Sequence, residues 1–377
     1  MDYINRIIEK QIVKWLFKNK IIFIVGPRQV GKTTLVKHLL DKYGKRENYY
    51  NCELLKIRQL LESKDPYLFK DLVGDSKFIV LDEAHSVNEI GKSLKLIHDT
   101  FPDIQIIATG SSSFQLKNKS DEPLTGRAFD FLLLPFSLKE ASIKTGRVEI
   151  LSVAGNILRF GLYPELIGKG EDESKMILDN LTSRYLYKDV LEFETIKKSD
   201  KIIRLLQLLA FQVGSEASIN ELSMKIGINR NTVERYLDLL EKAYVIFRLK
   251  ALSGNPRKEI TKKEKFYFYD TGIRNSLISQ YNPLDIRNDV GALWENFCIN
   301  ELIKNSVNKG EKKNYYFWRN LKGEEIDFLE ETGGKITAYE FKWKSGKIKK
   351  PETFFESYRD IEFKVVTQND IIKYFLS

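Results

Sequence analysis

The residues best suited to chemistry lie in a glycine-rich stretch near the start of the chain, which fits the pattern G-x-x-x-x-G-K-[ST]. Glycines at its two ends would let the backbone curl so that successive N–H groups face one anion. Lys32 would then neutralise the β- and γ-phosphates of ATP, and the Thr33 hydroxyl would hold Mg²⁺. The predicted nucleotide-binding residues are Gly26, Pro27, Arg28, Gln29, Val30, Gly31, Lys32, Thr33 and Thr34.

An acidic pair, Asp82 and Glu83, follows the apolar run FIVL. A strand that ends there would deliver Asp82 beside the P-loop, where it would bind Mg²⁺ together with Thr33. Glu83 is then the predicted general base for the attacking water. Read alone, such a pair is an ordinary acidic strand end, but the P-loop upstream favours the catalytic interpretation.

Three more residues are candidates for contact with the phosphates. Thr109 and Ser111 end the apolar stretch IQIIATGSSS and would sense the γ-phosphate; the alternative is that they cap the next helix. Arg127 precedes the apolar stretch FDFLLLPF and would reach a phosphate in its own subunit or in a neighbouring one.

The segments that must position these residues alternate between short apolar strands and helical stretches, which is typical of a parallel sheet covered by helices. We therefore predict a three-layer α/β/α P-loop domain over residues 1–150. Its predicted strands are Ile21–Val25, Tyr49–Asn51, Lys77–Leu81, Ile104–Ala108 and Phe129–Leu134.

Composition sets the limits for the rest of the chain. With 377 residues, of which 42% are hydrophobic, about two to three domains are expected. The net charge of +9 permits an anionic partner such as DNA. Apolar runs are far shorter than the ~20 residues that cross a bilayer, so no membrane is expected. Two distant cysteines, Cys52 and Cys298, favour a cytoplasmic protein without disulfides.

Beyond residue 150 the pattern changes twice. Residues 151–212 read as a helical lid or linker. Residues 213–285 then give a helix, a short turn, a second helix and a β-hairpin, the order of a winged helix. Ser218 is the predicted cap of the first helix and Gly227 its end.

The second of these helices would carry the DNA contacts of a winged helix. Arg230, Asn231 and Arg235 lie on its polar side and would face bases, although Glu234 and Asp238 share that side. Lysines around the hairpin would contact phosphates; they are Lys258, Lys262, Lys263 and Lys265. Winged helices also bind proteins, so both kinds of partner stay open.

Residues 286–377 form a small α/β unit with an acidic constellation like that of PD-(D/E)xK nucleases. Glu340 and Lys342 are two apart on a predicted strand and therefore share a face. Asp327 on the preceding strand can lie beside Glu340, and Glu295 lies on the helix before them. Such carboxylates would hold Mg²⁺ while Lys342 orients water. The alternatives are surface charges, or an inactive nuclease fold that only binds.

The order of motifs resembles one known family over the whole chain: prokaryotic AAA-type ATPases, related to the ORC and STAND lineages, with a C-terminal domain of unknown function 4143. The motifs that carry the resemblance are GPRQVGKTTL at 26–35, VLDEAH at 80–85, TGSSS at 109–113, LTGRAFDFLLLPFSLKE at 124–140, FGLYPE at 160–165, NRNTVERYLDLLEKAYVIFRL at 229–249, KFYFYDTGIRNSL at 265–277, GALWENFCINEL at 291–302, GEEIDF at 323–328 and YEFK at 339–342.

The resemblance implies that Gly161–Pro164 is the family's glycine–proline motif. Pro164 would lie near the nucleotide and couple it to the next domain. Arg127 belongs to the family's Gly-Arg pair, which strengthens the prediction that it contacts a phosphate. The overall expectation is an ATPase switch that uses ATP and Mg²⁺ and is coupled to DNA. The alternatives are an ATP-regulated, metal-dependent endonuclease, and a signalling or assembly protein whose C-terminal half binds proteins. A homo-oligomer or other protein partners are also possible.

Overall fold

The computed structural model describes residues 3–111, 124–186, 199–252, 264–320, 322–346, 350–358 and 360–376. By its internal contacts the chain divides into two compact units. Unit 1 consists of residues 1–134 with 242–244, and unit 2 consists of residues 135–241 and 245–377. The chain thus leaves the first unit at Leu134, earlier than the expected domain end at residue 150.

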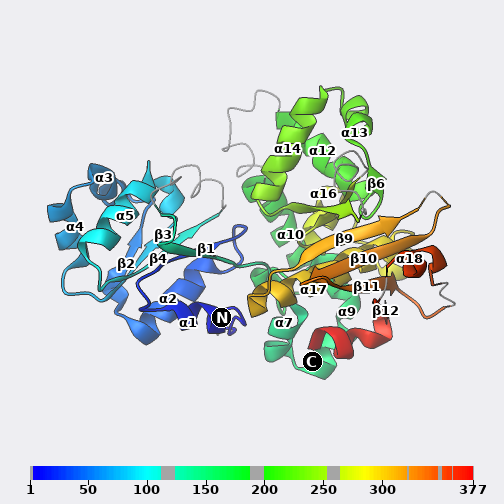
Figure 1. The fold of residues 1–377 in the computed structure, drawn as a ribbon, viewed down its shortest axis with the longest axis horizontal. Helices are drawn as coiled ribbons and strands as arrows, with labels where there is room; N and C mark the ends of the chain where they lie inside the picture. The colour runs from blue at the N-terminus through cyan, green and yellow to red at the C-terminus, as the bar shows by residue number, and fades with distance from the viewer. Residues whose placement is uncertain are drawn as a thin grey trace. The chain divides into compact units, whose positions relative to one another are not determined.

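Unit 1 is built on a parallel five-stranded sheet with the order β2-β3-β4-β1-β5 (Figure 1). Its strands are β1 (Ile21–Val25), β2 (Tyr49–Asn51), β3 (Phe78–Asp82), β4 (Gln105–Gly110) and β5 (Ala128–Leu132). Its helices are α1 (Glu9–Trp15), α2 (Lys32–Tyr43), α3 (Leu55–Ser63), α4 (Pro66–Val73) and α5 (Ile90–Thr100), with short 3₁₀ turns η1 (Arg46–Asn48) and η2 (Ala84–Ser86). The predicted strands are confirmed, with ends that shift by at most two residues.

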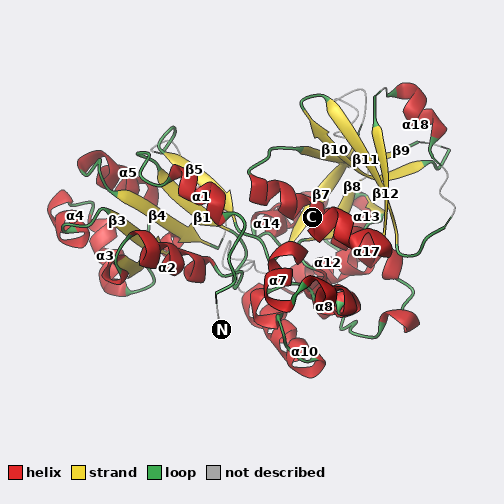
Figure 2. Cartoon of the chain, turned by 90° about the horizontal axis from the view of Figure 1, so that it is seen from below, coloured by secondary structure: helices red, strands yellow, loops and turns green. Residues whose placement is uncertain are grey.

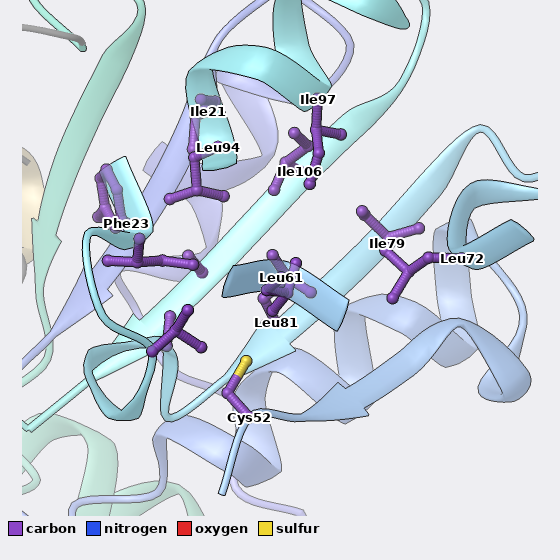
Figure 3. Packing of buried hydrophobic residues seen from close by; sticks show 14 of the residues in the cluster. Ile21, Phe23, Cys52, Leu61, Leu72, Ile79, Leu81, Leu94, Ile97 and Ile106 are labelled. Atoms are coloured by element: carbon purple, nitrogen blue, oxygen red, sulfur yellow. The ribbon is translucent and has the colours of Figure 1, made fainter. Parts of the chain in front are cut away.

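Helices cover both faces of this sheet because its central strands are apolar on both sides. On one face, alternate residues of β1, β3 and β4 pack against Leu61 of α3, Leu72 of α4 and Leu94 of α5 (Figure 3). On the other face, α2 contributes the buried Leu35 and Leu39. The three-layer α/β/α arrangement expected from the sequence is therefore present.

Unit 2 begins with helices. They are α7 (Leu138–Thr145), α8 (Arg147–Ser152), α9 (Ala154–Phe160), η3 (Pro164–Leu166), α10 (Glu171–Asn180), the π-helical turn η4 (Leu181–Leu186) and α12 (Ser199–Phe211). Then follow α13 (Ile219–Ile226) and α14 (Arg230–Lys242). Ser218 accepts a hydrogen bond from the Glu221 N–H, and Gly227 ends α13 in the left-handed conformation, as the residue types predict. The Asn229 side chain caps α14 in the same way, through the Thr232 N–H.

A seven-stranded sheet runs through unit 2 in the order β12-β11-β10-β9-β7-β8-β6 (Figure 2). Its strands are β6 (Glu216–Ala217), β7 (Ile246–Ala251), β8 (Glu264–Phe268), β9 (Asn314–Arg319), β10 (Glu325–Thr332), β11 (Lys335–Lys342) and β12 (Glu362–Thr367). The remaining helical elements are α16 (Thr271–Leu277), η5 (Leu284–Ile286), α17 (Val290–Lys309), α18 (Glu352–Ser357), η6 (Gln368–Asp370) and η7 (Ile372–Leu376).

This sheet crosses the boundary that the sequence placed between residues 285 and 286. Strand β7 pairs in parallel with β9, with Lys250 opposite Tyr316 and Ala251 opposite Phe317. The hairpin of the predicted winged helix and the strands of the predicted nuclease-like unit are therefore hydrogen-bonded to each other. None of the helices in the described ranges has the length and apolar character required to cross a bilayer.

Candidate nucleotide-binding site

The loop between β1 and α2 adopts a conformation that glycine permits at both ends. Gly26 has φ +151°, and a Cβ added there would lie 2.0 Å from the Leu133 carbonyl oxygen. Gly31 has φ +93° and forms the N-cap of α2. Gln29 between them also has a positive φ of 60°. The backbone thus curls around the N-terminus of α2, where N–H groups and the helix dipole favour an anion.

Lys32 is the first residue of α2, directly after this loop, and is buried. Its ammonium donates hydrogen bonds to the Gly26 carbonyl at 2.9 Å and to the Pro27 carbonyl at 2.7 Å. These bonds hold the Lys32 ammonium against the concave side of the loop. There, the oxygens of a bound phosphate would accept hydrogen bonds from the same ammonium. Of the neighbouring predicted residues, Gln29 and Thr34 are exposed, and Arg28 is half-buried.

Asp82 ends β3 in the middle of a hydroxyl network. Its Oδ2 accepts from the Thr33 hydroxyl at 2.7 Å and from the Tyr49 hydroxyl at 2.5 Å, and its Oδ1 accepts from the Thr109 hydroxyl. The structure therefore brings together Thr33, Asp82 and Thr109 as the sequence predicted. Threonine and carboxylate oxygens are ligands that suit Mg²⁺, so this donor set fits the ion that P-loop chemistry requires.

Tyr49 is the member of this network that the sequence analysis missed. Burial, together with its bond to Asp82, raises the pKa of Tyr49, so the phenol keeps its proton and acts as the donor. A tyrosine at the start of a three-residue strand has no local signature. It meets Asp82 because β2 pairs with β3, with Tyr49 opposite Val80 and Asn51 opposite Asp82.

Glu83 follows directly in a left-handed conformation, with φ 53°. Its carboxylate lies 3.1 Å from His85 Nδ1, and its backbone N–H donates to the Thr109 hydroxyl at 3.0 Å. Burial alone would raise the pKa of Glu83, but the contact with His85 and the charges of Lys32 and Arg28 outweigh it and lower that pKa. Glu83 is therefore a carboxylate at neutral pH, the form that a general base needs.

Ser111 lies one residue beyond β4, and β4 pairs with β1 so that Gly110 is opposite Val25. This register brings the buried Ser111 to the same sheet edge as the P-loop. Residues 112 and 113, the end of the predicted sensor stretch, lie outside the described residues. The sensor role of Thr109 and Ser111 remains a prediction.

Arg127 lies at the opposite edge of the sheet, which excludes a role at the nucleotide of its own chain. Its carbonyl accepts from the Ile21 N–H, at the start of β1, whereas the P-loop follows the end of that strand. Five residues of strand span about 16 Å, well beyond the length of an arginine side chain. The guanidinium pairs with Asp99, with Nε 3.0 Å from Oδ1. Action of Arg127 on a neighbouring subunit stays a prediction.

Replacing Arg127 with alanine therefore has two separable outcomes. Nucleotide affinity of the dilute chain should not change, because the side chain is remote from the P-loop. If copies assemble head to tail, turnover in the concentrated protein should fall by about 10³-fold or more. Turnover measured over a concentration series checks this, with Arg46→Ala as control because Arg46 forms a similar exposed pair with Asp41. Weaker nucleotide binding by the dilute Arg127→Ala protein would contradict the placement.

Pro164 belongs to unit 2, where it opens η3. The motif that contains it is held by close backbone packing. Gly161 has φ +78°, and a Cβ there would lie 2.0 Å from the Asp270 carboxylate, which accepts from the Leu162 N–H at 2.8 Å. Gly161 and Leu162 thus lie against Asp270, the N-cap of α16, whereas the proposed contact of Pro164 with nucleotide remains a prediction.

Three residues of the predicted acidic constellation of unit 2 lie together on the neighbouring strands β10 and β11. The pairing of Phe328 with Tyr339 brings Asp327 beside Glu340, and Asp327 accepts from the Phe341 N–H at 2.8 Å. Lys342 lies 2.7 Å from Glu340. Burial and the neighbouring Asp327 carboxylate raise the pKa of Glu340. The two strands therefore bring together three of the four residues that the sequence singled out.

Glu295 completes this cluster from α17, but it faces a counter-ion. Lys265 Nζ lies 3.5 Å from Glu295 and also pairs with Glu325, while the Tyr267 hydroxyl donates to Glu295 at 2.5 Å. Burial raises the pKa of Glu295 to about 7. In the described part of the chain, no three His, Cys, Asp or Glu side chains are grouped as ligands for a metal ion. The set Glu295, Asp327 and Glu340 does not fit a ready-made metal site.

Lys265 also corrects the expected DNA contacts, since it is buried in this cluster and cannot reach a phosphate. The other three lysines, at 258, 262 and 263, lie outside the described residues. On α14, Arg230, Asn231, Glu234 and Arg235 are exposed as predicted. Asp238 is paired with Arg248, so part of the negative charge expected to repel DNA is compensated within the fold.

Comparisons with known proteins match three separate segments of the chain. Residues 18–142 match the family described as AAA domain, residues 155–284 match a domain of unknown function (DUF8612), and residues 290–374 match a domain of unknown function (DUF4143). A protein of Mycobacterium tuberculosis described as uncharacterized is 27% identical over 331 residues, covering 87% of this chain and 71% of that protein. A protein of Methanocaldococcus jannaschii with the same description is 25% identical, covering 97% and 88%.

Solved structures add a distant likeness. The Aeropyrum pernix ORC1 protein in complex with DNA gives a TM-score of 0.33 at 11% identity, covering 69% of this chain and 86% of that one. The assignment rests instead on the AAA match, the parallel sheet and the loop that joins β1 to α2. The match of residues 18–142 to the AAA domain, the parallel sheet and the loop between β1 and α2 together support the expected AAA-type P-loop fold for this segment.

Proposed function

We propose that this protein is a Mg²⁺-dependent ATPase that works as a nucleotide-controlled switch, with DNA as the partner of its C-terminal half. The observation that carries the ATPase proposal is the convergence on Asp82 of Thr33 from the P-loop helix and Thr109 from β4, next to the buried Lys32. Mg²⁺ held by Thr33 and Asp82 would offset phosphate charge. Glu83, ionised and at the same strand end, would accept the proton of the attacking water.

The switch proposal rests on how tightly this site is built into the sheet. Thr109 donates to Asp82 and accepts from the Glu83 N–H, so the ends of β3 and β4 are joined by one side chain. A change in the contacts of Asp82 on nucleotide binding would therefore alter the ends of both strands. A ligand shifts such an equilibrium only through different contacts in the two states, which the γ-phosphate supplies.

DNA binding is supported by the exposed Arg230, Asn231 and Arg235 on α14. The double variant Arg230→Ala/Arg235→Ala should weaken binding to duplex DNA, because each arginine loses its expected base contact, and should lower the salt slope by up to about two, because two positive charges leave the groove. Fluorescence anisotropy with a labelled duplex, at several salt concentrations and with or without a non-hydrolysable ATP analogue, measures both effects. Arg46→Ala serves as the control for loss of surface charge.

The same titration tests the switch. We expect the analogue to change the affinity of the wild type for DNA by about fivefold or more, the lower end of typical coupling between two sites. Equal affinity with and without the analogue would remove the coupling to DNA. An absence of any salt-dependent binding would instead favour the role in which the C-terminal half binds proteins.

A second candidate function, metal-dependent DNA cleavage, is favoured by one observation, the juxtaposition of Asp327 and Glu340 with Lys342. A metal ion would have to be held by these two carboxylates, because Glu295 is paired with Lys265. The test is incubation of supercoiled plasmid with Mg²⁺ or Mn²⁺ and ATP, using the wild type, Asp327→Ala and Lys342→Ala. Nicking by the wild type that both variants lose would support cleavage. Equal or absent nicking in all three proteins would rule it out.

A further inference from the structure

Arg6, which no sequence motif marks, makes two long-range bonds inside unit 1. It is buried, with 5% of its surface exposed. One guanidinium nitrogen donates to the Val30 carbonyl at 2.9 Å, and the other donates to the Leu134 carbonyl at 2.6 Å. Val30 is within the P-loop, directly before Gly31. Leu134 is the last residue of unit 1 before the chain passes into unit 2.

A second contact joins the same two segments. The Leu133 N–H donates to the Val25 carbonyl at 2.8 Å, and Leu133 O occupies the space that a side chain at Gly26 would need. The start of the P-loop therefore lies against Leu133, and its end is tied through Arg6 to Leu134. Both ends of the loop that would enclose phosphate are thus mechanically linked to one short segment.

That segment is fixed just as firmly on its other side, within unit 2. The Phe136 N–H donates to the Leu162 carbonyl at 3.0 Å, and the Phe136 carbonyl accepts from Lys304 at 2.9 Å. The Leu138 N–H donates to Glu301 at 2.7 Å, and Lys304 pairs with Glu301. Along the chain, only Pro135 separates the anchored Leu134 from the anchored Phe136.

We infer that Arg6 is a positioning residue that passes the state of the P-loop to the connection at residues 133–138, so that the bond from Val30 to Leu134 through Arg6 is the element coupling nucleotide to unit 2. This inference rests on the proposed nucleotide switch. A guanidinium suits the role because its rigid fork holds two carbonyls in a fixed geometry, which the single ammonium of lysine does not.

Hydrogen exchange of the peptide that contains the Phe136 and Leu138 amides tests the inference. In the wild type, a saturating non-hydrolysable ATP analogue should change the exchange rate of this peptide by about fivefold or more. In Arg6→Met the ratio should fall to about one, and in Arg6→Lys it should fall to less than half of the wild-type value. Arg46→Met, which removes an exposed arginine of the same unit, should keep the full ratio.

Calorimetric binding of the analogue to the same samples separates this inference from the proposed function. A wild type that binds no nucleotide would end the proposed function. A wild type that binds without any exchange response, or a folded Arg6 variant with the wild-type ratio, would overturn only the role of Arg6. Loss of nucleotide binding in both Arg6 variants would also overturn it, since Arg6 would then build the loop and not transmit its state. If Arg6→Met does not fold, Arg6→Lys alone decides.

Discussion

Lys32→Ala is expected to abolish detectable binding of Mg-ATP. The ammonium is buried against the P-loop and would meet two phosphate groups, and each charge-assisted hydrogen bond contributes about 1.5–3 kcal/mol. Loss of two such bonds weakens affinity by about 10²–10⁴-fold, which carries a micromolar complex beyond the range of calorimetry. Titration calorimetry with a non-hydrolysable analogue and Mg²⁺ makes the measurement.

Lys42→Ala is the matched control, because Lys42 lies in the last turn of the same helix and is half exposed beside Glu9. It should bind nucleotide as the wild type does. Circular dichroism melting of Lys32→Ala must accompany the titration, since the variant also loses two bonds to loop carbonyls. A folded Lys32→Ala protein with undiminished affinity would mean that the loop does not bind triphosphate, and the assigned roles of Asp82 and Glu83 would lose their basis.

Glu83→Gln is expected to retain nucleotide binding and to lower turnover by about 10²–10⁴-fold, the usual contribution of a positioned general base. The amide keeps the size of the carboxylate but cannot accept a proton from water. Binding should persist because the P-loop and the Thr33–Asp82 contact are untouched. Single-turnover phosphate release with saturating Mg-ATP gives the rate, and Glu89→Gln, an exposed glutamate paired with lysines, is the control.

The pH dependence of turnover gives an independent check on Glu83. The pKa of this carboxyl is lowered, so the ionised, active form is present above that value and is lost only as the pH falls through it. Since this pKa lies below the ordinary value of about 4.3, Glu83 is at least nine-tenths ionised above about pH 5.3, and turnover of the wild type should not decline through loss of this carboxylate between neutral pH and about pH 5.3. A decline centred near neutral pH, or normal turnover by Glu83→Gln, would show that another group is the base.

The buried carboxylates of unit 2 have a counter-ion within the protein, Lys265. A buried carboxylate cluster is costly unless a cation compensates it. Here Lys265 supplies that cation from β8, on the strand pair predicted to be the wing. Lys265 and Glu295 come from regions that the sequence assigned to different domains. The two predicted domains therefore share one cluster of ion pairs.

The sequence by itself determined the nucleotide-binding loop, the strands of the first sheet and the acidic pair at the end of β3. Each of these is encoded locally. The spacing of Gly26 and Gly31 sets the curl of the loop. The apolar run before Asp82 and Glu83 predicts a strand and places these two acidic residues at its end. Local signals of this kind can be recognised in the sequence without knowing which residues are neighbours in space.

Only the tertiary structure decided which distant residues meet at the site. Tyr49 reaches Asp82 through the pairing of β2 with β3, and Arg127 is removed from the site by the parallel direction of β1 and β5. Lys265 is buried because β7 pairs with β9 and joins two predicted domains into one sheet. Arg6 joins Val30 to Leu134 across 104 residues of chain. Strand pairing and long-range side-chain bonds leave no mark on local spacing, since their register is fixed by packing of segments far apart in the sequence.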